Sequence, residues 1–314
     1  MRNFADRLMD AVAAKGTPAI VGIDPRLSLL PREVVEPFGL DEDPTPERAA
    51  KAVEAFGREI IDIVAPLVPA VKPQVAFFEQ LGWHGFRAYQ RTVRYAQDRG
   101  LLVIGDVKRG DIASTAAAYA EGHIGRAEIG GKRVRVIDAD AVTINPYLGS
   151  DAVEPFLEVA REVAKGLFVL VRTSNDSAAE LQHLRADGRP IYLHVADLVS
   201  RWGRDLVGRS GYSAVGAVVG ATSPEALAEA RRALPEALFL IPGYGAQGGT
   251  AADLAAAFDE NGRGAVVNSS RGIIYAWTRG RYKEEFGPGR WREAVRAALD
   301  DMRADLAAVQ GGRA

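Results

Sequence analysis

Short runs of apolar residues, many of them β-branched, recur along the chain and predict strands buried on both faces. Glycine, proline, asparagine, serine or a charged residue ends each run, as expected where a strand gives way to a loop. The runs occupy residues 19–24, 70–72, 101–108, 141–145, 167–171, 214–219, 238–241 and 264–268. The pattern therefore predicts eight strands.

Between these runs, apolar positions recur every three or four residues, which predicts helices with one buried face. Such patterns cover residues 4–12, 53–64, 86–96, 153–163, 198–202, 227–234 and 291–306. Eight strands alternating with helices fit a (β/α)8 TIM barrel better than a doubly wound sheet, and the turn at residues 22–26 has no GxGxxG motif. We expect an α/β fold: a single barrel domain over residues 1–314, with an N-terminal helix and a C-terminal closing helix.

Two predicted loops exceed the usual two to six residues of such a fold. They span residues 26–46, after the first strand, and 174–190, after the fifth. In a barrel both loops lie on the catalytic face, which makes them candidate lids. An insertion with no role in catalysis explains their length equally well.

The composition of the chain excludes several classes of protein and several kinds of site. With 314 residues, 47% of them hydrophobic, the chain can bury a large core, and 39 Lys+Arg against 41 Asp+Glu give no excess charge for nucleic acid or an anionic membrane. Zero cysteines exclude disulfides and thiolate zinc sites, and the histidines at 84, 123, 183 and 194 form no i, i+4 metal pair. No secretory signal or membrane-length apolar stretch is present, so we expect a cytoplasmic protein.

Charged and polar residues gather where the predicted strands end, which is where barrel enzymes place their active sites. Asp106 and Lys108 are two residues apart, so strand alternation points both side chains the same way, and Asp111 follows closely. Lys72 ends the neighbouring strand, so two ammonium groups and two carboxylates can converge. A salt-bridge network at the barrel mouth would need the same residues. The other strand ends carry Asp24, Asn145, Thr173 and Ser174.

Glycine-rich loops follow the last two strands, at residues 243–249 and 268–272. Glycines let backbone N–H groups approach a phosphate, and Arg271 can bind two of its oxygens. The loops after strands seven and eight are the usual phosphate site of this barrel. Glycine also serves tight turns without any ligand, but two such loops, one with Gln247 and the other with Arg271, favour a phosphate site.

The segment Asp-Val-Lys-Arg-Gly-Asp-Ile at 106–112 resembles the Asp-x-Lys-x-x-Asp-Ile signature of orotidine 5′-phosphate decarboxylases. Further blocks resemble the longer bacterial, or type 2, branch of that family, and the resemblance runs from about residue 4 to residue 307. These blocks are residues 22–25, 71–79, 142–149, 173–175, 219–222, 242–248 and 270–272.

The resemblance implies a homodimeric, cofactor-free enzyme that converts orotidine 5′-phosphate into UMP and CO2 in pyrimidine biosynthesis. Lys108 would donate the proton within an array completed by Lys72, Asp106 and Asp111. Asp111 and Thr115 would reach the partner subunit's site.

The resemblance also implies the substrate contacts. Asp24 and Lys72 would bind ribose hydroxyls, and Ser174 the pyrimidine amide edge. Ser270 would belong to the substrate-binding set, with Gln247 and Arg271 holding the phosphate. No metal ligand is implied.

Two other functions fit part of the pattern. A related sugar-phosphate decarboxylase or aldolase would use the Asp-x-Lys-x-x-Asp array with Mg²⁺ to stabilise an enediolate. Ser174 with Asn175, and the blocks around Asn145 and Gln247, favour a pyrimidine nucleotide instead. A non-catalytic phosphosugar-binding barrel would leave the charged array without a task.

Overall fold

The computed structural model describes residues 2–221, 223–244 and 252–311. Eight parallel strands close into a barrel in the order β1-β12-β11-β10-β7-β6-β3-β2. The sequence pattern predicted each of them to within one residue at either end. The strands are β1 (Ala19–Ile23), β2 (Ala70–Pro73), β3 (Leu102–Arg109), β6 (Ala141–Ile144), β7 (Gly166–Arg172), β10 (Ser213–Val219), β11 (Ala237–Pro242) and β12 (Ala265–Ser269).

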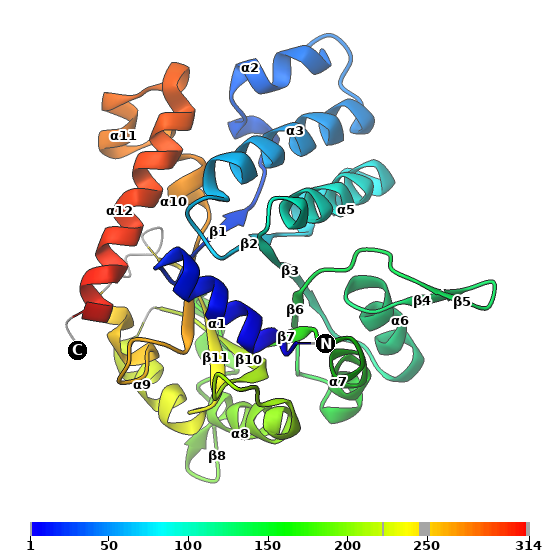
Figure 1. The fold of residues 1–314 in the computed structure, drawn as a ribbon, viewed down its shortest axis with the longest axis vertical. Coiled ribbons are helices and arrows are strands. Elements are labelled where there is room, and N and C mark those ends of the chain that lie inside the picture. The colour runs from blue at the N-terminus through cyan, green and yellow to red at the C-terminus, as the bar shows by residue number, and fades with distance from the viewer. Residues whose placement is uncertain (1, 222, 245–251, 312–314) are drawn as a thin grey trace.

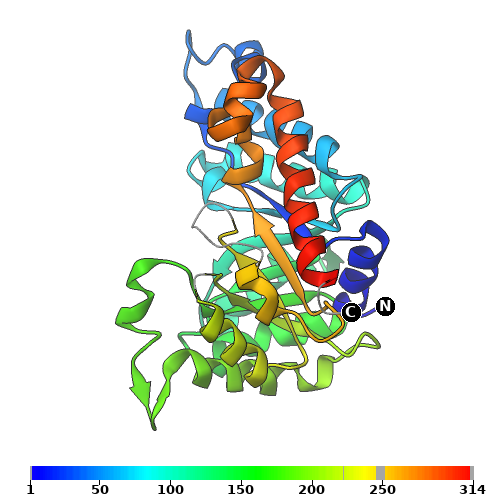
Figure 2. The same ribbon diagram turned by 90° about the vertical axis from the view of Figure 1, so that its left-hand side faces the viewer.

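Helices surround the strands (Figure 1). The predicted ones are α3 (Pro46–Val64), α5 (Gly82–Asp98), α7 (Ser150–Val163), α8 (Ile191–Gly203), α9 (Pro224–Ala233) and α12 (Trp291–Gly311). One long helix, α6 (Ala113–His123), was not predicted. Shorter helices are α4 (Ala76–Glu79), α10 (Arg271–Ile274) and α11 (Gly280–Glu285). Figure 2 shows α12 beside α3, against which it packs. Within the described residues, no helix is long and apolar enough to cross a bilayer.

The N-terminal helix α1 (Phe4–Lys15) plugs one end of the barrel. Its Phe4, Leu8 and Met9 side chains join a buried cluster to which all eight barrel strands contribute. Gly166 at the start of β7 permits this packing, because a Cβ there would lie 2.1 Å from the Phe4 ring. Figure 1 shows α1 crossing in front of the strands. Since this end is filled, the opposite end, where the strands have their C-termini, is the open one.

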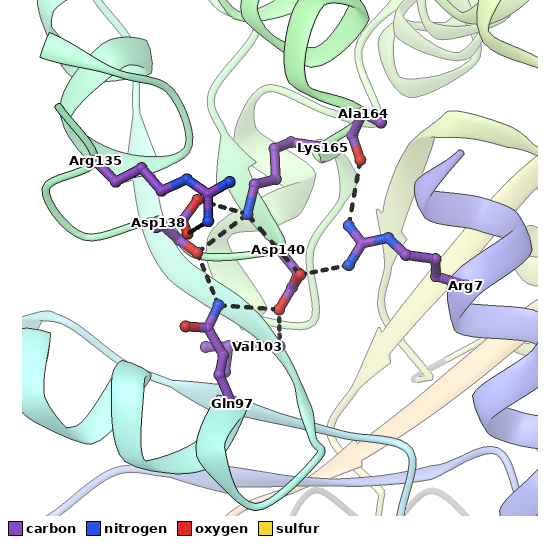
Figure 3. Close-up of polar contacts among 8 residues, drawn as sticks. All are labelled: Arg7, Gln97, Val103, Arg135, Asp138, Asp140, Ala164 and Lys165. Atoms are coloured by element: carbon purple, nitrogen blue, oxygen red, sulfur yellow. Dashed lines mark hydrogen bonds and ion pairs between the residues drawn. The ribbon is translucent and has the colours of Figure 1, made fainter. Parts of the chain in front are cut away.

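A buried ion network fastens α1 to the strands (Figure 3). Asp140, just before β6, accepts hydrogen bonds from Arg7 Nη1 (2.6 Å) and from the Val103 backbone N–H (3.0 Å). Lys165 forms an ion pair with Asp138 at 2.9 Å and donates to the Asp138 carbonyl. These charges lie at the N-terminal ends of β3, β6 and β7, so they belong to closure of the barrel rather than to the open end.

The two long loops contain more structure than the sequence indicated. The loop after β1 holds two 3₁₀ turns and the short helix α2 (Arg32–Val35). The loop after β7 holds a 3₁₀ turn and a hairpin, β8 (Arg185–Ala186) with β9 (Arg189–Pro190). A second hairpin, β4 (Ala127–Ile129) with β5 (Lys132–Val134), follows α6. Whether either long loop acts as a lid stays a prediction.

Candidate functional site

A cavity of about 400 Å³ opens at the C-terminal ends of the barrel strands. Charged groups form one part of its wall and apolar side chains another. This mixture suits a planar organic ligand that carries polar groups on one edge. The wall consists of Lys72, Asp106, Lys108, Thr143, Leu170, Thr173, Ser174, Asn175, Val218, Leu240 and Pro242.

Asp106 is the centre of the charged wall. Lys72 Nζ, at the end of β2, lies 2.5 Å from Asp106 Oδ2, and Lys108 Nζ lies 2.5 Å from Asp106 Oδ1. The Lys72 and Asp106 side chains are each 7% exposed, whereas that of Lys108 is 45% exposed. Lys108 is therefore the ammonium group of this array that a ligand can reach most directly. The contacts among the three residues were predicted from their positions at the strand ends.

Two neutral residues complete the hydrogen bonds to Asp106, and the sequence analysis missed both as site residues. Gln74 Nε2 donates to Asp106 Oδ2 at 3.0 Å, and Thr143 Oγ1 donates to Asp106 Oδ1 at 2.9 Å. Both residues lie inside blocks that carried the family resemblance. The sequence did contain a signal for each residue. Gln74 is two residues after Lys72 at the end of β2, and Thr143 lies in β6, the strand that pairs with β3.

Opposing effects set the protonation states of the array. Burial by itself disfavours the charged forms, but the two ammonium groups outweigh it and hold the pKa of Asp106 far below its ordinary value. For Lys72, burial is likewise outweighed, by the carboxylates of Asp106 and Asp24, and its pKa is raised. Asp106 is therefore an anion and Lys72 a cation at neutral pH.

Asp111 does not join the array within one chain. Its carboxylate accepts a hydrogen bond from the Ile112 backbone N–H at 2.8 Å, and among the described residues it forms no ion pair. Thr115, in the first turn of α6, is exposed. The expectation that both carboxylates converge on the lysines is thus met by Asp106 alone, and a place for Asp111 in a partner's site stays a prediction.

Asp24 and Ser174 both lie near the array, Asp24 close enough to act on the charge of Lys72 and Ser174 in the wall of the same cavity. Asp24 follows β1, and its buried Oδ1 atom has no hydrogen-bond partner among the described residues. The Tyr275 hydroxyl bridges the Asp24 carbonyl and the Arg26 N–H, which fixes this strand end. Ser174 follows β7 and packs on Gly220, where a Cβ would lie 2.9 Å from the Ser174 backbone nitrogen. A buried carboxylate oxygen without a hydrogen-bond partner calls for an explanation, and an acceptor role toward a ligand hydroxyl is one.

The predicted phosphate site is described in part. Ser270 ends the β12 loop and Arg271 begins α10, exposed and without an ion pair among the described residues. Burial and the Arg271 cation both lower the pKa of Arg279, so the charge of Arg271 acts on a second guanidinium group here. Such a concentration of positive charge favours an anion. Gln247 lies outside the described residues.

The chain is similar over most of its length to proteins of one family. Residues 34–281 match the family described as "Orotidine 5'-phosphate decarboxylase / HUMPS family". A protein of Rhodopirellula baltica named orotidine 5′-phosphate decarboxylase is 46% identical over 306 residues, covering 98% of this chain and 99% of that one. One of Caldicellulosiruptor bescii with the same name is 43% identical over 277 residues, covering 88% and 91%.

A solved structure extends the comparison to three dimensions. The structure of Leishmania donovani OMP decarboxylase matches with a TM-score of 0.73 and 31% identity, covering 98% of this chain and 99% of that one. The likeness therefore spans the whole barrel, including the strand ends that carry the charged array.

Proposed function

The chain belongs to the orotidine 5′-phosphate decarboxylase family, and on that premise we propose that it converts orotidine 5′-phosphate into UMP and CO2. The observation that carries the proposal is the Lys72–Asp106–Lys108 array, in which a buried carboxylate holds one exposed ammonium group at 2.5 Å. A non-catalytic phosphosugar-binding barrel would not need this array of buried charges.

The chemistry needs a positioned cation more than it needs a nucleophile. When the C6–CO2 bond of orotate breaks, its electron pair stays on C6 in an orbital in the ring plane, where no neighbouring carbonyl delocalises it. The Lys108 ammonium stabilises this developing carbanion and then transfers a proton from Nζ to C6, which leaves a neutral amine that solvent reprotonates. Asp106 stays ionised throughout and fixes the ammonium in place.

The remaining site residues bind the nucleotide in this proposal. Asp24, with its unpaired oxygen, and Lys72 bind the ribose hydroxyls, and Ser174 binds the amide edge of the pyrimidine. Ser270, Arg271 and Gln247 hold the phosphate. Phosphate contacts far from C6 supply binding energy that closes the site and aligns the charges.

The proposed enzyme is a homodimer whose sites receive Asp111 and Thr115 from the partner subunit. Exposed apolar side chains after β3 and β6, two strands that pair with each other, support this arrangement. Ile112, next to Asp111, is 51% exposed, and Tyr147, which follows β6, is 74% exposed. Exposed apolar groups beside a site are typical of surfaces covered by a second chain. A cytoplasmic location, a single-domain chain and membership of the longer bacterial branch belong to the same proposal and rest on the sequence pattern.

Loss of ultraviolet absorbance of orotidine 5′-phosphate, followed with purified protein in the presence of EDTA, tests the proposed reaction. We expect turnover that EDTA does not diminish, together with stoichiometric UMP. Turnover that requires added Mg²⁺ would favour the aldolase-like alternative, and nucleotide binding without turnover would favour the non-catalytic barrel.

A further inference from the structure

The pairing of β3 with β6 is irregular at the array. Gly105 pairs with Val142, and Arg109 pairs with Ile144, so three residues of β3 stand opposite one residue of β6. That single residue is Thr143. A bulge of this kind removes backbone groups from the ladder and redirects side chains.

The bulge has two consequences for Lys108. Its φ angle is 44°, in the left-handed region that residues with a Cβ adopt rarely. Its backbone N–H, like that of Val107, is no longer opposite a strand carbonyl and needs another acceptor. The conformation that presents Lys108 to the cavity is therefore one that its neighbours must impose.

Thr143 supplies what the bulge lacks. Its Oγ1 accepts hydrogen bonds from the N–H groups of Val107 (3.0 Å) and Lys108 (2.9 Å), and it donates to Asp106 Oδ1. A hydroxyl has one proton and two lone pairs, so these three bonds use all of its capacity. Because two N–H donors occupy the lone pairs, the hydroxyl proton must point to Asp106. Thr143 is 1% exposed, so water does not compete for these bonds.

We propose that Thr143 is a positioning residue for the proton-donating ammonium group. It holds the backbone of Lys108 in its left-handed conformation and orients the Asp106 carboxylate that anchors Lys108 Nζ. It acts through these two residues rather than on the substrate. The proposal rests on the proposed function, since it assumes that Lys108 protonates the product carbanion.

The test compares two substitutions that differ in the hydroxyl. Thr143→Val keeps the shape but leaves two buried N–H donors without an acceptor and removes one of the two hydrogen bonds to Asp106 Oδ1. We expect kcat to fall by about 10- to 100-fold while KM changes by less than about 3-fold. Thr143→Ser keeps all three hydrogen bonds, and we expect it to recover most of kcat. Thermal unfolding of each variant shows whether it folds.

A double substitution separates positioning from a general structural effect. If Thr143 acts through Lys108, then adding Thr143→Val to a Lys108→Ala enzyme should lower the residual kcat by less than about 3-fold. A full 10- to 100-fold further loss in that background would overturn the proposal. So would a Thr143→Val enzyme with wild-type kcat, or a folded Thr143→Ser enzyme as slow as the valine variant.

The same assays distinguish this proposal from the proposed function. Absence of decarboxylation by the wild-type protein would contradict the reaction itself. An active wild type whose rate does not depend on the hydroxyl at position 143 would leave the reaction intact and refute only the role of Thr143.

Discussion

Asp106 connects the polar side chains of the site through its hydrogen bonds. Its two oxygens receive four hydrogen bonds, from Lys72, Gln74, Lys108 and Thr143. A buried carboxylate so fully paired stays ionised and cannot rotate, since each rotation would leave a donor unpaired. Its anionic form therefore fixes the exposed ammonium of Lys108 without itself taking part in proton transfer.

Lys108→Ala should lower kcat/KM for orotidine 5′-phosphate by about three powers of ten or more, because it removes both the stabilising cation and the proton donor. Steady-state kinetics by ultraviolet absorbance measure the loss. Lys132→Ala, on the exposed hairpin strand β5, is the matched control and should retain wild-type kinetics. Near-normal turnover by the Lys108 variant would contradict the proposal that Lys108 stabilises and protonates the carbanion.

Arg271→Ala should lower kcat/KM by about 10- to 100-fold, because a charge-assisted hydrogen bond to phosphate contributes about 1.5–3 kcal/mol. The loss should be confined to substrates with a phosphate, so orotidine itself should react equally slowly with both enzymes. Arg201→Ala, an exposed arginine of α8, serves as control. Unchanged kinetics for the Arg271 variant would show that the phosphate is held elsewhere.

At the scale of elements, the helix that the sequence pattern missed is α6, which follows β3, the strand that carries Asp106 and Lys108. Its sequence has alanine at most positions where a helix usually carries larger apolar residues, so no apolar stripe reveals it. Alanine nevertheless has the highest intrinsic helix propensity. The buried side of α6 contains Ala116, Ala120 and His123, so two alanines and one histidine, rather than a stripe of large apolar residues, face the core.

His123 gives α6 a measurable pH dependence. Burial, with a smaller effect of the Arg109 cation, lowers the pKa of His123 to about 4 in the folded chain, against 6.5 for the unperturbed side chain. Between these values the unfolded state binds more protons, so folding stability falls as the pH drops from 6.5 to 4. The contribution is about 3 kcal/mol.

Urea unfolding of the wild type and of His123→Gln at several pH values between 7 and 4 measures this contribution. Their difference in unfolding free energy cancels the titration of the carboxylates that both proteins share. We expect the variant to gain about 3 kcal/mol relative to the wild type over this range. A difference that does not change with pH would mean that His123 is protonated without cost in the folded state.

The network of Figure 3 is the second element-scale feature that can be tested. Asp140→Ala removes the ionic partner of Arg7 and the acceptor of the Val103 N–H at the base of β3, and leaves Arg7 only its bond to the Ala164 carbonyl. We expect a loss of about 3–5 kcal/mol in unfolding free energy. Asp197→Ala breaks an exposed pair with Arg189 and should cost less than about 1 kcal/mol. Equal costs for the two variants would contradict a structural role for the buried network.

At the scale of the whole molecule, one chain supplies an incomplete array. Asp106 lies between two lysines, while the second acid of the signature, Asp111, is partly exposed and forms no ion pair among the described residues. Dimerisation by a two-fold axis would present each chain's loop to its partner's site. The exposed side chains of Ile112 and Tyr147 would be covered in the same step.

Mixing Lys108→Ala and Asp111→Ala subunits tests this arrangement. If Asp111 crosses the interface, each heterodimer regains one site with both residues intact, and random mixing should restore about a quarter of wild-type activity. Each variant alone serves as the inactive control. Verified heterodimers with no regained activity would show that Lys108 and Asp111 act within one chain.

The sequence by itself determined the barrel and much of the charged array. A strand of a parallel sheet is buried on both faces, so it is continuously apolar and ends where polar residues begin. The local sequence pattern therefore predicts the eight strands of the barrel and their polar ends. The same pattern also predicted that the charged side chains of Lys72, Asp106 and Lys108 converge at the strand ends.

Only the tertiary structure decided which neutral groups complete that set. Gln74 and Thr143 lie 32 and 37 residues from Asp106 along the chain, and they meet it through the register of neighbouring strands around a bulge. The two-residue spacing correctly predicted that Lys108 lies on the same side as Asp106, but it did not predict the left-handed backbone conformation of Lys108. The direction of a hydrogen bond between distant residues depends on how the barrel closes, and no local pattern contains that geometry.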